Sequence, residues 1–477
     1  GMTPTPLPET LGVGILHLGL GAFHRAHQAA FTQDAIAAGG GDWGIEAVSM
    51  RNPALAETLT DQGGRYTLIE RHPEGPKLLE MTVIRKARAL PGNELRLVER
   101  MADPAIQIVT ITVTEKGYGA DIGARRLNRS NSAVTHDLAH PQAVPQSLIG
   151  QIVAGLAARQ DAGHRGLTLM SCDNLPENGD LLAALVLEFA QETKPDLVGW
   201  ITSTCCFPNS MVDRITPAAT DETYAIAQAA LGHPDLAAIE TEPFRQWVIQ
   251  DSFAGARPAW EQAGVQIVPD VAPFETMKLR LLNGAHSLIA YLGSLAGLAA
   301  VRDVMAQADL ANVVQAHMAL AAQTLPPAAG LDAESYANAL TIRFANPAID
   351  HRCLQIAMDG SQKLPQRIFA PARLQLDAGR GIGTFALAAA AWLRFAEGVD
   401  EKGRQLDLND PLAADIRSAL AQAGTNPEDR VSAIATIPAL AHQGVLEDER
   451  FSRMTAEFLN ILEQRGAIAA GQAALKM

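Results

Sequence analysis

Short apolar runs alternate with segments of helical spacing over the first half of the chain. Runs typical of buried strands lie at 13–18, 44–50, 106–113, 166–171 and 197–202. Between them, the pattern predicts helices at 24–38, 145–161 and 180–193. Strands that alternate with helices form parallel sheets, because each helix returns the chain to the same end of the sheet. We therefore expect an α/β fold whose N-terminal domain, 1–270, is a Rossmann-type doubly wound parallel sheet.

The pattern changes at about residue 271. From there to residue 477, segments rich in Ala and Leu replace the β-branched runs. Helical spacing is clearest at 303–323, 333–344, 383–396 and 445–466. These segments predict a mainly α-helical C-terminal domain over 271–477.

Three polar side chains interrupt a Leu-rich helical segment at 275–293. Lys278, Asn283 and His286 fall within about 140° of one another on an α-helix, so they share one half of its surface. Glu275 lies one turn before Lys278, close enough to pair with it or to exchange a proton through water. An amphipathic helix could carry these residues by chance, but the surrounding leucines leave little room for a solvated stripe. A desolvated lysine is a recognised general base, so the segment indicates a catalytic site.

A glycine-containing turn follows the first apolar run. The run VGILHL leads directly into Gly19 and Gly21, and a helical segment comes next. Glycines in this context let backbone N–H groups approach a pyrophosphate, which also faces the positive end of the helix. His24 stands where the usual fingerprint has a third glycine. We expect this domain to bind a dinucleotide, with Gly19, Gly21 and Phe23 against it.

The residues after the second predicted strand bear on the choice of cofactor. A dinucleotide fold usually places an acid there for the adenosine ribose, whereas this chain has Arg51 and Asn52. Arg51 could favour a 2′-phosphate, or it could be a surface residue in a loop. Thr114 and Asn174 also follow predicted strands, at the end of the sheet where ligands bind. We expect Arg51 and Thr114 to border the cofactor, and we expect NAD while leaving NADP open.

His24 and His27 are three residues apart, a spacing that some metal sites use. No Cys or carboxylate cluster completes a set of ligands nearby. We therefore expect no metal, and a structural or phosphate-facing role for His24. A metal-dependent enzyme is the alternative, which activity in a strong chelator would exclude.

Composition narrows the class of protein. The chain has 477 residues, of which 48% are hydrophobic, enough for two domain cores. Its formal net charge of −14 disfavours nucleic acid as a partner, since proteins that bind nucleic-acid phosphates carry clusters of Lys and Arg. Charge or Gly interrupts the apolar runs before membrane-spanning length, and no charged-then-apolar leader is seen. We expect a cytoplasmic protein with no membrane partner; the sequence does not indicate its oligomeric state.

Seven motifs resemble the long-chain mannitol dehydrogenase family, in the expected order and from about residue 11 to beyond 370. They are GAFHRAHQ, TVTEKGY, SCDNLPENG, FPNSMVDRITP, EPFRQWV, KLRLLNGAHS and DGSQKLPQR. That family includes mannitol 2-dehydrogenases and fructuronate reductases, also called mannonate oxidoreductases. The resemblance implies a zinc-independent, NAD-dependent oxidoreductase with a Rossmann domain, a helical C-terminal domain and an active site between them.

The resemblance also implies catalytic roles. Lys278 matches the lysine that takes the proton from the hydroxyl being oxidised, and returns it in reduction. Asn174 and Asn283 match asparagines whose amides hydrogen-bond the reacting oxygen. His286 matches a histidine that orients the substrate, and Glu275 a glutamate that relays the proton to solvent.

A second group of residues bears on the substrate. Asp213 and Lys363 fall on motifs that, by resemblance, contribute to the polyol or keto-sugar pocket. A sugar acid would need a cation for its carboxylate, and Lys363, Arg352 and Arg367 are the candidates.

We expect hydride transfer between a nicotinamide cofactor and a sugar acid or polyol, with fructuronate to D-mannonate as the first hypothesis. Oxidation of mannitol at C2 is the alternative within the class. A non-catalytic nucleotide-binding sensor is the alternative outside it. The set of Lys278, Asn283 and His286 argues against a sensor, since a sensor needs no proton-transfer group.

Overall fold

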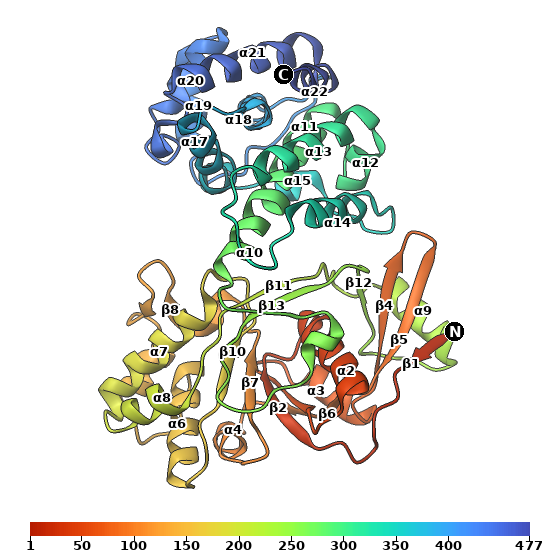
Figure 1. The fold of residues 1–477 in the computed structure, drawn as a ribbon, viewed down its shortest axis with the longest axis vertical. Helices are drawn as coiled ribbons and strands as arrows, with labels where there is room; N and C mark the ends of the chain where they lie inside the picture. The colour runs from red at the N-terminus through yellow and green to blue at the C-terminus, as the bar shows by residue number, and fades with distance from the viewer. The chain divides into compact units, whose positions relative to one another are not determined.

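The computed structural model describes residues 1–477, which form two compact units, Gly1–Ala272 and Pro273–Met477 (Figure 1). The first unit contains a parallel sheet together with helices, and the second unit is mainly helical. This confirms the predicted fold class. None of the helices combines the length and apolar character needed to cross a membrane.

The main sheet of the first unit has five strands in the order β10-β7-β2-β3-β6. Its members are β2 (Val13–Leu18), β3 (Gly44–Ser49), β6 (Ile84–Ala89), β7 (Ile108–Ile111) and β10 (Thr168–Ser171). All neighbouring pairs are parallel. Ranked by position in the chain, the order is 3-2-1-4-5, which is the Rossmann order. The order reverses between β2 and β7, so a ligand is expected beyond the carboxyl ends of these two strands.

The faces of β2, β3, β7 and β10 are buried, which explains why these strands are mainly apolar. The edge strand β6 is mostly half-buried and carries Arg85, Lys86 and Arg88, so the apolar pattern did not predict it. Ile108 contributes to one hydrophobic core and its neighbour Val109 to the other, because successive side chains point to opposite faces. The first core includes residues of α2 (Gln28–Gly39) and α3 (Ala54–Asp61). The second includes residues of α4 (Glu94–Met101), α6 (Leu148–Asp161) and α7 (Asn178–Thr193).

The predicted strand at 197–202 is wrong, because these residues belong to helix α8 (Leu197–Thr204). Its buried residues, Leu197 and Ile201, are four apart, which is helical and not strand spacing. The place beside β10 is taken by Cys206 instead, whose N–H donates to the Leu167 carbonyl at 3.1 Å. The other four predicted strands are confirmed as β2, β3, β7 and β10, within a few residues.

Two smaller sheets complete the first unit, and the apolar pattern did not predict them. One has the order β1-β5-β4-β12 and the other β11-β13-β14. Their strands are β1 (Met2–Pro4), β4 (Tyr66–His72), β5 (Gly75–Met81), β12 (Ile239–Thr241), β11 (Ser210–Asp213), β13 (Gln246–Gln250) and β14 (Gln266–Val268). A short hairpin pairs β8 (Ala120–Asp121) with β9 (Arg126–Leu127), and α1 (Ala22–Ala26), α5 (Ser132–Ala139) and α9 (Asp221–Leu231) are the remaining helices.

The second unit packs around α18 (Gly383–Ala396), whose residues are almost all buried. α11 (Gly284–Ala296) and α21 (Glu449–Arg465) pack against it. The other helices are α10 (Ala272–Met277), α12 (Val301–Ala306), α13 (Ala308–Ala322), α14 (Ala333–Ala345), α15 (Cys353–Ile356), α16 (Gly360–Leu364), α17 (Ala370–Asp377), α19 (Ala413–Ala423), α20 (Pro427–Ala435) and α22 (Ala467–Leu475). The single helix predicted at 303–323 is two helices, because Gln307 is extended and its side chain caps α13 through the Leu310 N–H.

Candidate active site

The predicted helix at 275–293 is helical throughout but not uniformly α-helical. α10 is followed by a π-helical segment, η3 (Lys278–Asn283), and then by α11. In η3 the backbone bonds span five residues, as in the bond from the Gly284 N–H to the Leu279 carbonyl. Residues five apart therefore come close to one line, and Lys278 and Asn283 are such a pair. The 140° separation expected from α-helical spacing is too large, and π-helical turns are frequent at functional sites.

The polar residues of this segment lie on its less buried side. Lys278, Asn283 and His286 are half-buried, whereas the adjoining Leu281 and Leu282 are buried. Glu275, on the preceding helix α10, is half-buried as well. Four of the five predicted catalytic residues therefore share one continuous helical segment of the second unit. The fifth, Asn174, is an exposed residue of the first unit, in the loop after β10.

His286 packs against two rings that the sequence pattern did not identify. Its ring centroid is 5.0 Å from that of Phe344 and 5.0 Å from that of His351. Burial, and next the neighbouring Arg343, lowers the pKa of His351. A neutral His351 therefore faces His286 edge to face, and no spacing in the sequence could have signalled the contact.

Arg367 contacts the backbone of the catalytic segment. It lies in a second π-helical segment, η4 (Pro365–Phe369), which follows α16. Its Nη1 donates to the Asn283 carbonyl at 3.3 Å and to Ser287 Oγ at 3.2 Å. The backbones of the two π-helical segments also pack closely, since a Cβ on Gly284 would lie 3.3 Å from the Arg367 carbonyl oxygen. Arg367, predicted to bind substrate, thus joins η4 to η3.

The other two predicted substrate cations differ in their surroundings. Lys363 is half-buried, and its Nζ donates to the Ile356 carbonyl at 3.0 Å. Burial, and next the charge of Arg367, lowers the pKa of Lys363. Arg352 is exposed and pairs with Asp350, with Nη2 and Oδ2 3.0 Å apart. An ammonium has three N–H donors, so Lys363 keeps donors for a ligand beyond its carbonyl contact.

A cavity of about 730 Å³ opens in the first unit at the carboxyl ends of β2, β3 and β7. Four of the five predicted cofactor residues line it, namely Gly19, Gly21, Arg51 and Thr114. Phe23 does not, and its ring stacks on His27 at 5.0 Å between centroids. The cavity is also lined by residues that were not predicted, among them Ser49, Thr112, Lys116, Asn131, Ser147 and Gln151.

Glycine suits the two positions of the turn, 19 and 21, for different structural reasons. Gly19 has a φ of 104°, and a Cβ there would lie 2.0 Å from the Thr112 carbonyl oxygen, so no other residue fits. A Cβ on Gly21 would meet only the Gly19 carbonyl oxygen, at 3.9 Å, so the space beside Gly21 is open to the cavity. Gly21 precedes α1, whose first-turn N–H groups no side chain caps. This backbone fits the pyrophosphate of a dinucleotide.

His24 supports the turn from inside the protein. Its side chain is buried and stacks on His17, with ring centroids 3.4 Å apart, while its Nδ1 contacts Gln28 Oε1 at 3.2 Å. His17 Nε2 in turn contacts the Gly19 carbonyl at 3.2 Å. Burial lowers the pKa of His24 to about 3. A neutral imidazole pair therefore packs behind the glycine turn, which is a structural role.

His24 and His27 do not belong to a set of side chains that could bind a metal. His27 Nε2 donates to the Gln246 carbonyl at 2.7 Å and its Nδ1 accepts from Gln28 Nε2 at 2.8 Å. Nowhere in residues 1–477 do three His, Cys, Asp or Glu side chains gather as a metal site would require.

Cations, and no carboxylates, line the cavity. Its charged residues are Arg51, at the end of β3, and Lys116, after β7, and both side chains are exposed. The Oδ1 of Asn52, the neighbour of Arg51, accepts the backbone N–H of Ala54 at 2.9 Å. In a chain with a net charge of −14, this local positive charge suits the phosphates of a nucleotide.

The loops that follow β7 and β10 contact each other. The Asp173 carboxylate accepts the backbone N–H groups of Val113 at 3.1 Å and Thr114 at 3.0 Å. Asn174 follows Asp173 directly. Asp213, predicted for the substrate, is buried at the end of β11 in the same unit.

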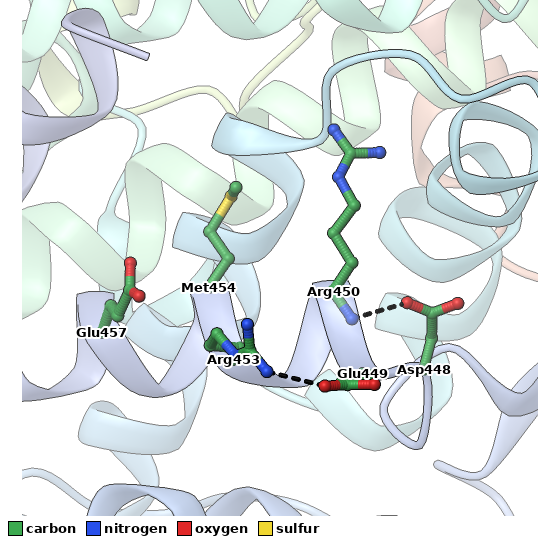
Figure 2. A pocket seen from close by; sticks show the side chains of 6 residues that line it. All are labelled: Asp448, Glu449, Arg450, Arg453, Met454 and Glu457. Atoms are coloured by element: carbon green, nitrogen blue, oxygen red, sulfur yellow. Dashed lines mark hydrogen bonds and ion pairs between the residues drawn. The ribbon is translucent and has the colours of Figure 1, made fainter.

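A further pocket, on the N-terminal part of α21, holds none of the predicted site residues (Figure 2). It is lined by Asp448, Glu449, Arg450, Arg453, Met454 and Glu457. Its charges are mixed, and the exposed Arg453 and Glu449 pair with each other at 2.6 Å. We assign no ligand to this surface.

Residues 13–262 match the family described as the mannitol dehydrogenase Rossmann domain, and residues 270–448 match the mannitol dehydrogenase C-terminal domain. The D-mannonate oxidoreductase of Escherichia coli (strain K12) is 42% identical over 460 residues, which cover 95% of this chain and 94% of that protein. The crystal structure of a D-sorbitol dehydrogenase in substrate-free form has a TM-score of 0.92 at 31% identity, covering 98% of this chain and 97% of that one. The Pseudomonas fluorescens mannitol 2-dehydrogenase ternary complex with NAD and D-mannitol has a TM-score of 0.77 at 32% identity, with 100% and 97% covered.

Proposed function

The chain belongs to the mannitol dehydrogenase family of oxidoreductases, and on that premise we propose that it reduces fructuronate to D-mannonate with a nicotinamide cofactor and no metal. The observation that carries the proposal is η3, where Lys278 and Asn283 lie half-buried on a π-helical turn beside the buried Leu281 and Leu282. A lysine in such surroundings can exchange a proton with substrate near neutral pH without a metal.

In this proposal Lys278 carries the proton of the reaction. When bound, the nicotinamide supplies the hydride that the carbonyl carbon accepts. The Lys278 ammonium gives its proton to the carbonyl oxygen as that hydride arrives, and Glu275 restores the proton from solvent. The amides of Asn174 and Asn283 donate hydrogen bonds to the same oxygen, which stabilises its developing negative charge. His286, held by Phe344 and His351, orients the substrate.

The cofactor residues are assigned from the cavity of the first unit. Gly19 and Gly21 would hold the pyrophosphate through their backbone, and Thr114 would border the cofactor beyond β7. We propose NAD as the cofactor, since the Pseudomonas fluorescens relative was solved with NAD. Arg51 in place of the usual acid, with no carboxylate in the cavity, supports acceptance of NADP as well.

Lys363 is our candidate for the group that binds the carboxylate of a sugar acid. Arg367 is engaged with η3 and Arg352 with Asp350, whereas Lys363 has donors left. Asp213 is our candidate for binding a hydroxyl of the substrate. Mannitol oxidation is the second candidate function, and the 32% identity to a mannitol 2-dehydrogenase favours it.

A substrate panel tests the proposal. NADH oxidation would be followed with fructuronate, tagaturonate and fructose, and NAD reduction with mannitol. We expect the highest kcat/KM with fructuronate. We also expect Lys363→Ala to raise KM for fructuronate at least tenfold while KM for fructose changes little, because fructose has no carboxylate. Turnover of fructose and mannitol alone would establish the second candidate, and no turnover with any of the four would refute both.

A further inference from the structure

Thr114 has a strained backbone at the edge of the cofactor cavity. It follows β7 with a φ of 64° and a ψ of 168°, a region that only glycine adopts readily. Such conformations persist only where the surrounding structure holds them, and they gather at functional sites. Thr114 lines the cavity, so its conformation sets the shape of the cavity wall.

The side chain of Asp173 holds this turn in place. Asp173 Oδ2 accepts the Val113 N–H at 3.1 Å, and Oδ1 accepts the Thr114 N–H at 3.0 Å. The Tyr118 hydroxyl donates to Oδ2 at 2.5 Å. Burial raises the pKa of Asp173, while these three donors act in the opposite direction. The carboxylate thus satisfies two successive N–H groups that the strained turn directs toward it.

Asp173 is itself fixed by its backbone. The preceding residue, Cys172, donates its N–H to the Ile111 carbonyl at 2.8 Å and so continues the pairing of β10 with β7. The Asp173 carbonyl accepts Asn178 Nδ2 at 3.1 Å, and Asn178 Oδ1 accepts the Ser210 N–H at 2.8 Å. The next residue after this anchored position is Asn174.

We propose that Asp173 is a positioning residue that couples two parts of the site in the first unit: the strained Thr114 turn at the cofactor cavity and the loop that presents Asn174. The coupling to Asn174 rests on the proposed function, whereas the coupling to the cavity does not. By holding the Thr114 turn, Asp173 lowers the dissociation constant of the nicotinamide cofactor. By holding the loop that presents Asn174, it raises kcat.

The test uses variants that relax or remove the backbone strain at Thr114. Asp173→Asn replaces one acceptor by an amide N–H that faces a backbone N–H, so the turn relaxes. We expect the dissociation constant for NADH, measured by fluorescence titration, to rise about tenfold and kcat to fall at least tenfold. Thr114→Gly removes the strain, because glycine adopts a positive φ without penalty. In the double variant we expect NADH affinity to return to within about threefold of wild type while kcat stays low, since Asn174 is still displaced.

Two further variants complete the design. Asp161→Asn makes the same change of charge on an exposed residue and should leave both constants unchanged. Tyr118→Phe removes one donor and keeps the carboxylate, so a threefold rise in the NADH dissociation constant is expected even where Asp173→Asn fails to fold. Wild-type NADH affinity in both Asp173→Asn and Tyr118→Phe would overturn the proposal, as would a double variant that binds NADH no better than Asp173→Asn. NADH titration needs no substrate, so it decides the coupling to the cavity even if no sugar is turned over.

Discussion

The buried histidines behind the glycine turn predict a steep loss of stability of the first unit at mildly acidic pH. His17, His24 and His27 are fully buried, and burial is the main reason that the pKa of each lies below its usual value of 6.5. For His24 and His27 the pKa is about 3. The unfolded chain therefore takes up protons that the folded unit does not, and stability is lost as pH falls below 6.5.

The size of this effect is given by linkage. Between about pH 7.5 and about pH 5.5, each imidazole that stays neutral in the folded unit and titrates normally in the unfolded chain lowers the free energy of unfolding by about 1.3 kcal/mol. Three such residues give about 4 kcal/mol, a large part of the 5–15 kcal/mol typical of a domain. Most carboxylates stay ionised over this range, which makes it suitable for isolating the histidines.

Urea denaturation at the two pH values, followed by Trp fluorescence, measures the loss. His24→Gln should reduce the pH-dependent difference by about 1.3 kcal/mol, whatever it does to stability at either pH. The control, His233→Gln, removes an exposed imidazole and should leave the difference unchanged. An unfolding free energy that is the same at both pH values would refute the reasoning, and so would equal pH dependence in wild type and His24→Gln.

Three further predictions concern catalysis. Arg367→Ala should lower kcat at least tenfold for fructuronate and for fructose alike, because losing its bonds to Asn283 and Ser287 loosens η3, whereas the control Arg453→Ala should match wild type. A rise in KM confined to fructuronate in steady-state assays would instead assign Arg367 to the substrate carboxylate. Lys278→Ala should lower kcat by roughly 10²–10⁴-fold while NADH affinity in fluorescence titrations is kept, and near-normal turnover would contradict its role as the proton-transfer group. Arg51→Asp should shift the ratio of kcat/KM for NADH over NADPH at least tenfold toward NADH, and an unchanged ratio would remove Arg51 from the adenosine ribose.

Elements with a continuous apolar run could be predicted from the sequence. β2 and β3 were predicted correctly because strands buried on both faces are mainly apolar, although β2 contains the buried His17 and β3 the buried Glu46. Residues 197–202 are similarly apolar but belong to α8, since the choice between helix and strand for a short apolar run depends on tertiary packing. The small sheets of the first unit escaped prediction because charged residues such as those of β4 and β5 break their apolar pattern.

The site, too, could be predicted only where a local sequence pattern marks its residues. Gly19 and Gly21 follow a recognisable strand, and the polar residues of 275–293 contrast with their leucines, so residue type and order were sufficient to find them. The contacts of Arg367 with Asn283 and of Asp173 with Thr114 join residues 84 and 59 positions apart. No local pattern encodes such pairs, and neither the π-helical turn nor the positive φ of Thr114 has a signal in the residue types present.

The π-helical turn makes the backbone hydrogen-bonding pattern of the catalytic segment part of its chemistry. Removing one residue between Lys278 and Asn283 would let the backbone return to α-helical bonding without any loss of apolar character. The two catalytic residues would then be four apart, about 40° on an α-helix, so they would still share one line. α-Helical bonding with the present number of residues would instead place Asn283 about 140° from Lys278, although every catalytic side chain would still be present. For this segment, residue count and bonding pattern must match, and a one-residue gap in an alignment would mark a relative whose segment is α-helical and not one that has lost the reaction.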